Sequence, residues 1–177
     1  MRFIIYFFLL CALTMAVRAR EVRVAEAEVT EVGIYTSRVV RVTSNADVIQ
    51  GKLDWLDGFT LIQSTTNVPA RIGTRFGFRF RVLGSPPNAP IVLRVVGKHP
   101  PFTNPGTGKT TTRDEYELPS WIGDTYTSFS FDEEWELVVG EFTFEIWHED
   151  KKLCKQSFMV VEDNKVGSSS KRGVPSP

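Results

Sequence analysis

The stretch RFGFRFRV, residues 75–82, alternates polar and apolar side chains with a period of two. In an extended chain, one face would carry only apolar side chains, those of Phe76, Phe78, Phe80 and Val82. The other face would carry Arg75, Gly77, Arg79 and Arg81. Because successive side chains of a β-strand point to opposite faces, the pattern predicts a strand with one buried and one solvated face.

The same alternation recurs in EFTFEIWHED, residues 141–150, with Phe142, Phe144 and Ile146 facing inward. A turn leads from it into KLCKQSFMVV, residues 152–161, which predicts a hairpin with Phe158 also inward. A two-residue turn at Asp150-Lys151 would pair His148 with Leu153 and Trp147 with Cys154. The arginines of residues 75–81 are expected to face Glu141 and Glu145 across neighbouring strands.

The rest of the chain also favours strands. Residues 91–97 and 124–132 are two further candidates, and residues 22–42 predict two strands broken near Val32-Gly33. Residues 53–58 predict a short helix or another turn, before a further strand at residues 59–63. No stretch keeps a helical period for ten residues, and Gly and Pro punctuate the chain at short intervals. This pattern predicts an all-β fold, and a two-layer antiparallel β-sandwich is favoured over a barrel.

The two ends differ from this β pattern. Residues 1–19 combine an early arginine, an uncharged apolar run and a Val17-Arg18-Ala19 cleavage site, which predicts a secretory signal peptide. The mature chain would have no stable membrane span and would be periplasmic or secreted; an uncleaved anchor is the alternative, because Arg18 stands beside the cut. Residues 20–165 are expected to form one β-sandwich domain, and the polar tail of residues 166–177 to be disordered.

Composition excludes several function classes. The chain has 21 basic and 21 acidic residues, so no basic excess indicates nucleic-acid binding. Cleavage after Ala19 would leave Cys154 as the single cysteine, buried or available for an intermolecular disulfide. The fragment GTGKT resembles a nucleotide-binding loop, but Thr103 stands where that loop needs its first glycine. We therefore expect no nucleotide and no cofactor.

The sequence contains few residues that could form a catalytic or metal-binding site. His99 and His148 are the only histidines, and the expected hairpin register would point His148 and Cys154 to opposite faces. Asp124 and residues 132–134 offer carboxylates for Ca²⁺, but a solvated acidic turn is favoured. An enzyme would be indicated by a deep pocket lined by His99, Asp114 and Glu115. A carbohydrate-binding module would be indicated by Trp121 and Trp147 on one surface.

The segment between residues 97 and 116 is interpreted as a connection of over a dozen residues, long enough to be functional. Its prolines restrict the chain and lower the entropy lost on binding. Phe102, Asn104 and Lys109, together with neighbouring Trp121, are the candidate partner-binding residues.

Several of these stretches resemble a known family. Residues 68–82, 97–118 and 130–161, with GIYT at residues 33–36, are similar to the bacterial exported family catalogued as domain of unknown function 3859. The resemblance implies a small exported protein and carries no known activity. The final hairpin looks like that of immunoglobulin-like domains, so the expected fold is an immunoglobulin-like sandwich. The expected function is a noncatalytic binding or interaction module with an unknown envelope or extracellular protein as partner.

Export gives the first testable prediction. The mature protein is expected to begin at Arg20, because the apolar run and the small-residue site precede it in the required order. Mass spectrometry of the purified native protein measures this directly. Membrane-bound protein that retains Met1 to Ala19 would contradict the prediction.

Overall fold

The computed structural model describes residues 21–163, so the predicted signal peptide and the predicted tail lie outside the described residues. The elements in chain order are β1 (Arg23–Ser44), β2 (Lys52–Gln63), β3 (Asn67–Ala70), β4 (Arg75–Ser85), β5 (Pro90–Thr103), β6 (Thr110–Trp121), β7 (Asp124–Ser130), the 3₁₀ helix η1 (Glu134–Glu136), β8 (Gly140–His148) and β9 (Lys151–Glu162). Within residues 21–163 no helix is long and apolar enough to cross a membrane.

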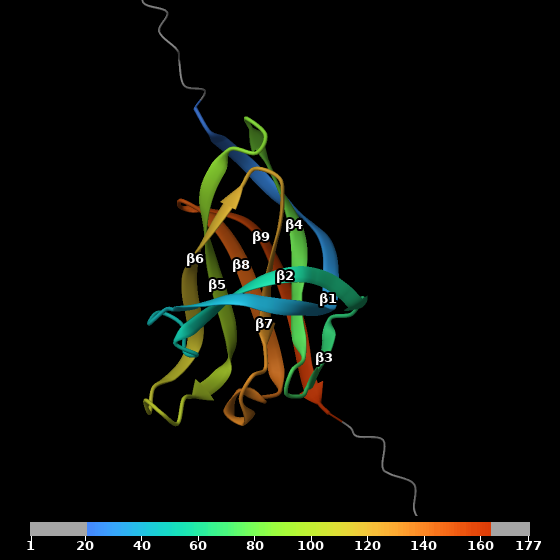
Figure 1. The fold of residues 1–177 in the computed structure, drawn as a ribbon, viewed down its shortest axis with the longest axis vertical. Helices are drawn as coiled ribbons and strands as arrows, with labels where there is room; N and C mark the ends of the chain where they lie inside the picture. Colours follow the sequence, from blue (N-terminus) through green and yellow to red (C-terminus); the bar gives the residue numbers. More distant parts are fainter. Residues whose placement is uncertain (1–20, 164–177) are drawn as a thin grey trace, which may run out of the picture.

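The strands form two sheets that pack face to face (Figure 1). The four-stranded sheet has the order β2-β1-β4-β7, and the five-stranded sheet has the order β3-β9-β8-β5-β6. Neighbouring strands are antiparallel except β3 and β9, which pair in parallel. The predicted all-β sandwich is confirmed, and β6 and β7 are the edge strands on one side of it.

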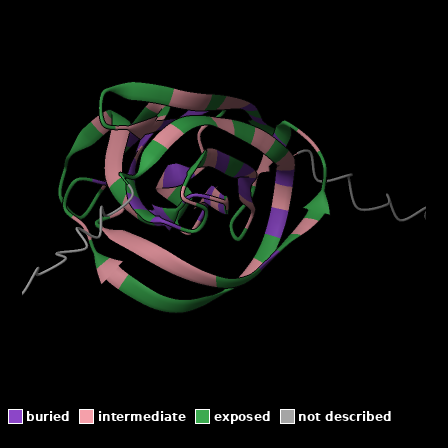
Figure 2. Cartoon of the chain, turned by 90° about the horizontal axis from the view of Figure 1, so that it is seen from above, coloured by how far each residue is buried: buried purple, intermediate pink, exposed green. Residues whose placement is uncertain are grey.

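The core lies between the two sheets (Figure 2), and phenylalanine is its most frequent residue. The residues predicted to face inward are all buried: Phe78, Phe80, Phe142, Phe144 and Phe158. Phe76 is at the centre of the aromatic cluster, with its ring centroid 5.2–6.1 Å from five other phenylalanine rings on β7, β8, β9 and the segment after β7. The period-two pattern therefore assigns the core-facing side chains of β4 and β8 correctly, although Thr143 and Glu145 on the outer face of β8 are buried as well.

The N-terminal third differs from the sequence-based expectation. One strand of 22 residues, β1, replaces the two predicted strands, and residues 53–58 belong to β2 instead of a helix or turn. Gly33 is not a breaker: a Cβ there would lie 2.0 Å from the Gln63 carbonyl oxygen, so glycine permits the close approach of β2. Bulges in β1 let the strand bend as it leaves the sandwich.

Residues 36–61, the arm, are a two-stranded ribbon made by the second half of β1 and most of β2. The arm lies across the outer face of the four-stranded sheet and runs toward β6 (Figure 1). Phe59 stacks between Tyr35 and Tyr126, with ring centroids 4.0 and 4.3 Å apart. The Tyr126 hydroxyl donates to the Leu56 carbonyl at 3.1 Å. These contacts fix the arm against the sandwich.

The arm and its neighbours also receive the outward arginines of β4. Arg75 pairs with Asp54 at 3.0 Å, and Arg79 donates to the Phe59 carbonyl. The expected pairing of these arginines with Glu141 and Glu145 is wrong, because β4 and β8 belong to different sheets. Glu145 instead pairs with Lys98, at 2.9 Å, within its own sheet.

The β8–β9 hairpin also has a different register from the expected one. Its turn residues are Glu149 and Asp150, so His148 pairs with Lys151. A bulge after Ile146 then places Cys154 opposite Ile146. Cys154 packs against the core, and burial raises the pKa of its thiol to about 12, so the thiol stays protonated and unreactive at neutral pH.

The core gives the second prediction. Phe76→Ala should lower the free energy of unfolding by about 3–5 kcal/mol, because it removes a buried ring that contacts both sheets. Ile62→Ala, at a side chain that is 65% exposed, should change it by about 0.5 kcal/mol or less. Urea unfolding of both variants measures the difference. Equal midpoints for the two variants would show that Phe76 is not central to the core.

Candidate functional site

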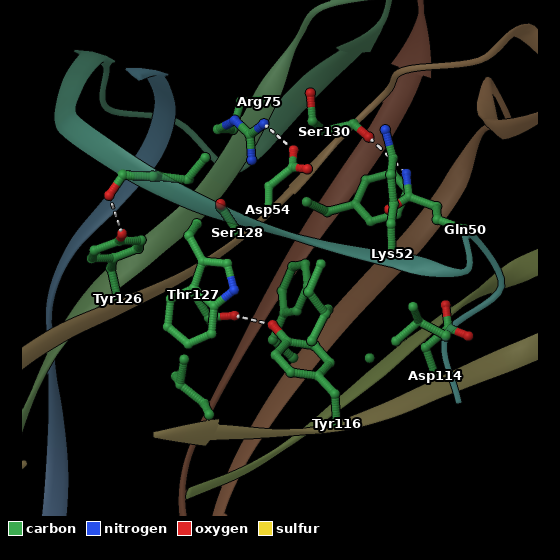
Figure 3. Close-up of a pocket in the computed structure, with 18 of the residues that line it drawn as sticks. Gln50, Lys52, Asp54, Arg75, Asp114, Tyr116, Tyr126, Thr127, Ser128 and Ser130 are labelled. Atoms are coloured by element: carbon green, nitrogen blue, oxygen red, sulfur yellow. Dashed lines mark hydrogen bonds and ion pairs between the residues drawn. The ribbon is translucent and has the colours of Figure 1, made fainter. Parts of the chain in front are cut away.

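A cavity of about 260 Å³ opens between the edge strands β6 and β7 (Figure 3). The two edge strands belong to different sheets and do not pair through their backbones, so the sandwich is open on this side. The end of the arm, residues 48–56, covers the opening and contributes a third wall. Most of the surface that lines the cavity is apolar, and it includes the side chains of Leu53, Trp55, Tyr116, Leu118, Trp121, Phe129 and Phe144.

Two side chains hold the tip of the arm by the backbone of Ile49. The Ile49 N–H donates to Asp114 Oδ1 at 2.8 Å, and Asn104 Nδ2 donates to the Ile49 carbonyl at 3.0 Å. Asp114 lies on β6 and Asn104 begins the β5–β6 loop, so both ends of the contact belong to the five-stranded sheet. Ile49 itself is buried. The arm thus connects the outer face of one sheet with the edge of the other.

A second group of contacts holds the arm beside η1. Gln50 Nε2 donates to Glu136 Oε1 at 2.6 Å, and Glu136 Oε2 accepts from the backbone N–H groups of Asp132 and Glu133. Burial raises the pKa of the fully buried Glu136 above its usual range, against these hydrogen bonds. Lys52 pairs with Asp132 at 2.8 Å, and this hydrogen bond raises the pKa of Lys52.

A pair of hydroxyl groups lies deep in the cavity. The Tyr116 hydroxyl on β6 and Thr127 Oγ1 on β7 are 2.9 Å apart and bridge the open side of the sandwich (Figure 3). Burial raises the pKa of Tyr116, so the phenol stays protonated over the physiological range. The two hydroxyl groups therefore contribute neutral donors and acceptors within apolar walls.

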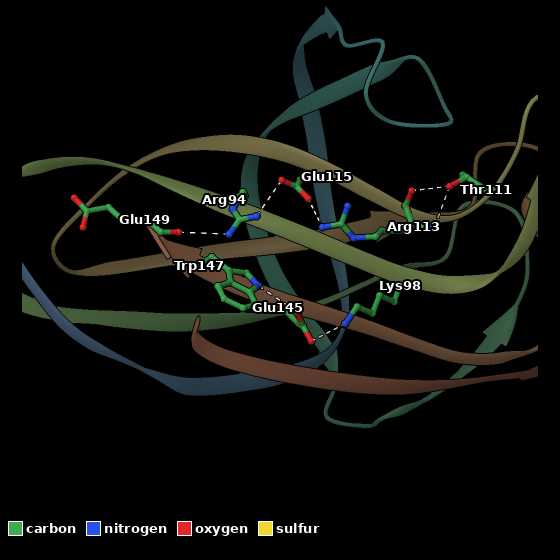
Figure 4. Close-up of polar contacts among 8 residues, drawn as sticks. All are labelled: Arg94, Lys98, Thr111, Arg113, Glu115, Glu145, Trp147 and Glu149. Atoms are coloured by element: carbon green, nitrogen blue, oxygen red, sulfur yellow. Dashed lines mark hydrogen bonds and ion pairs between the residues drawn. The ribbon is translucent and has the colours of Figure 1, made fainter. Parts of the chain in front are cut away.

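His99 and Asp114 both line the cavity, as the enzyme hypothesis requires, but their geometry is that of a structural pair. His99 Nε2 is 3.3 Å from Asp114 Oδ2, and Nδ1 is 2.7 Å from the Pro100 carbonyl oxygen. Both ring nitrogens thus face acceptors of the protein, which leaves neither for a substrate. Glu115, the third expected residue, binds Arg94 and Arg113 on the outer face of the five-stranded sheet (Figure 4).

The predicted long connection is much shorter in the structure. β5 continues to Thr103 and pairs with β6 again at Phe102 and Thr111, so the loop contains only residues 104–109. A register shift after Lys98 lets the strand continue past its prolines. Phe102 is fully buried and stacks on His99 at 4.2 Å between centroids. The expectation that Phe102 contacts a partner is therefore wrong.

The other three candidate residues do not lie on one surface. Asn104 Oδ1 accepts from the backbone of Gly106 and Thr107, so its amide is used within the loop and at the arm. Lys109 is exposed at the start of β6, whereas Trp121 is 47% exposed at the far end of the same strand. The structure thus separates Trp121 from the loop by the length of β6.

The two tryptophans of the carbohydrate hypothesis lie on different faces. Trp121 lines the cavity, whereas Trp147 lies on the outer face of the five-stranded sheet (Figure 4). There Arg94 stacks on the Trp147 ring, 5.1 Å from the centroid, and the indole N–H donates to Glu145 at 3.2 Å. The structure therefore gives no shared stacking surface for Trp121 and Trp147.

The carboxylates considered for Ca²⁺ are also separated. Asp124 begins β7 and pairs with Arg81 at 2.7 Å, whereas Asp132 follows the other end of β7 and pairs with Lys52. Among the described residues, no group of three or more metal-ligating side chains is placed to hold a metal ion.

Sequence reasoning missed the contribution of the arm to the cavity. The sequence predicts a helix or turn at Leu53 and Trp55, which line the cavity. Leu53, Asp54 and Trp55 nevertheless alternate between apolar and polar side chains. That alternation is a strand signal, but the ribbon it forms packs on a face instead of extending the sandwich. Its position follows from contacts with residues far away in the sequence, such as those of Asp54 with Arg75 and of Ile49 with Asp114.

The two hydrogen bonds to the Ile49 backbone, from Asn104 and to Asp114, lead to the third prediction. Asn104→Asp keeps the acceptor for Gly106 and Thr107 but places an oxygen against the Ile49 carbonyl. Amide hydrogen exchange in the arm should then accelerate by about tenfold or more, because an unpaired buried group costs about 1–3 kcal/mol. Lys109→Ala, in the same loop, is the control and should leave exchange unchanged. An unaltered arm in Asn104→Asp would show that Asp114 alone holds the tip.

This architecture is similar to that of a known protein, and the sequence matches a known family. A crystal structure of an immunoglobulin-like protein from Pseudomonas aeruginosa is similar, with a TM-score of 0.53 and 24% sequence identity. The similarity covers 77% of this chain and 98% of the other, and it confirms the immunoglobulin-like fold. A search of curated proteins finds no match. The family described as domain of unknown function (DUF3859) matches residues 23–160, and the chain belongs to that family.

Proposed function

We propose that this chain is an exported, noncatalytic immunoglobulin-like module that binds a protein of the cell envelope or the extracellular space. The contact surface in this proposal is the first strand of the arm. Export is supported by the signal-like pattern of residues 1–19. A noncatalytic role is supported by the cavity, where both ring nitrogens of the single histidine face protein acceptors.

The observation that carries this proposal is a run of exposed valines. Val39, Val40 and Val42 are 43%, 56% and 54% exposed, although valine is a residue that folded chains usually bury. They stand within four positions of each other, whereas most other exposed apolar residues are scattered over the domain. A contiguous exposed apolar patch on a monomeric domain is typical of a protein-binding surface.

The position of these valines on the arm supports a binding role. Pairing of β1 with β4 ends at Tyr35, so from residue 36 onward β1 pairs with β2 alone. Arg38 and Arg41 flank Val39 and Val40 in the sequence, and Arg38 is ion-paired with Asp57 at 2.8 Å. A partner would thus meet an apolar strip with a polar border, which is the usual anatomy of a protein interface.

The fourth prediction tests this surface with matched triple variants. Replacing Val39, Val40 and Val42 by threonine keeps shape and strand propensity but adds three hydroxyl groups. Capture of a crosslinked partner from intact cells should fall by about tenfold or more, since each buried methyl or methylene group contributes about 0.8 kcal/mol. Quantitative mass spectrometry of the crosslinked material measures the loss.

The control triple carries threonine at Val92, Val139 and Val161, which are exposed on other parts of the domain. It should capture the partner like the unaltered protein, and both triples should melt at similar temperatures. Equal capture by the two triples would overturn the assignment to the arm. Loss of capture in Lys109→Ala or Trp121→Ala, with the arm variant unaffected, would instead place the contact at the loop or at the rim of the cavity.

A further inference from the structure

We infer that the cavity beneath the arm is a binding site for a small, neutral aromatic molecule. This site is separate from the valine strip, because none of the three valines lines the cavity. The inference depends on three properties of the cavity, which are its size, the pairing of its charges and the free hydrogen-bonding capacity of two buried hydroxyl groups.

Size limits the ligand to one or two rings. The cavity volume of about 260 Å³ lies between that of an engineered cavity of about 150 Å³ that holds benzene and the roughly 300–1,000 Å³ of drug-sized sites. Its walls contain indole, phenol and phenyl groups from all three sides, including Trp55 on the arm, Tyr116 on β6 and Phe129 on β7. Aromatic walls favour an aromatic ligand, since offset and edge-to-face ring contacts add to apolar burial.

The charged groups of the lining exclude a charged ligand. Lys52 pairs with Asp132 at 2.8 Å, and Arg75 pairs with Asp54 at 3.0 Å. The Asp114 carboxylate is occupied by His99 and the Ile49 N–H. Glu117 also lines the cavity, but it is exposed at the edge of β6, where water reaches its charge. Inside the cavity a charged ligand would therefore lose its hydration without meeting a buried counter-ion that lacks a partner, which is costly in an apolar site.

The hydroxyl pair of Tyr116 and Thr127 supplies the polar contact. Each hydroxyl group carries one hydrogen, and the two groups are joined by a single hydrogen bond of 2.9 Å. One hydroxyl hydrogen consequently remains for an acceptor on the ligand. Since the pair lies among apolar side chains, a ligand with one carbonyl or hydroxyl group satisfies it better than a pure hydrocarbon does.

The fifth prediction uses three probes of the same shape. Benzamide is neutral, benzamidine carries a positive charge and benzoate carries a negative charge at neutral pH. Benzamide should shift the NMR signals of β6, β7 and the arm at millimolar concentration. The other two probes should bind at least about tenfold more weakly, because their charges are unpaired in the cavity.

Two variants separate the polar contact from simple burial. Changing Tyr116→Phe together with Thr127→Val keeps the shape and removes both hydroxyl groups, so the double variant should bind benzamide about three- to tenfold more weakly and leave toluene unchanged. Leu118→Trp fills the cavity and should abolish the binding of both probes. Val92→Trp, at an exposed position on the neighbouring strand, is the control and should abolish neither.

Each outcome decides the inference. Equal affinity for the three isosteres, or an equal effect of the double variant on benzamide and toluene, would overturn it. The absence of any shift with the unaltered protein would show that the cavity is only a packing gap. If Leu118→Trp fails to fold, the comparison of benzamide and toluene in the Tyr116→Phe, Thr127→Val double variant still tests the inference. None of these results depends on capture of a protein partner, so failure here leaves the valine strip to its own test.

Discussion

The contact of Phe76 with rings from both sheets is the interaction on which the rest of the structure depends. Its ring meets Phe129 and Phe131 at the β7 end of one sheet and Phe142, Phe144 and Phe158 of the other. With no disulfide among the described residues, this apolar contact holds the two layers together. Because the sheets meet at their centres, their edges at β6 and β7 remain apart.

The arm covers this open side, and it does so through a few polar contacts. A two-stranded ribbon is marginally stable alone, so its position depends on what it touches. Phe59, stacked between two tyrosines, anchors the base of the arm, and the backbone of Ile49 anchors its tip. Between these points Asp54 and Lys52 form ion pairs with the sandwich. The cavity is therefore shaped by the arm as much as by the two sheets.

The parts of this structure that sequence predicts are those with local causes. The alternation of residues 75–82 and 141–147 determines which side chains face the core, because it depends only on the geometry of one strand. The partners of Arg75 depend on which strands are neighbours, and that topology has no signature in either strand. The prolines near Phe102 predict a loop that offers this side chain to a partner, whereas a register shift continues the strand and buries it. The cavity is formed by β6, β7 and the arm together, so no single stretch of the sequence predicts it.

The hydrogen bonds that hold Ile49 at the tip of the arm also affect association between copies of the chain. Unpaired edge strands of a sheet can pair with another sheet, and folded proteins commonly block them. Here β6 carries Pro119, which has no N–H to donate, while Asp114 on the same strand binds the tip of the arm. On β7, the Ser130 carbonyl accepts from Gln50 of the arm. The hydrogen bonds that close the cavity thus also keep both sheet edges from templating an aggregate, and loosening the arm would expose the chain to that hazard.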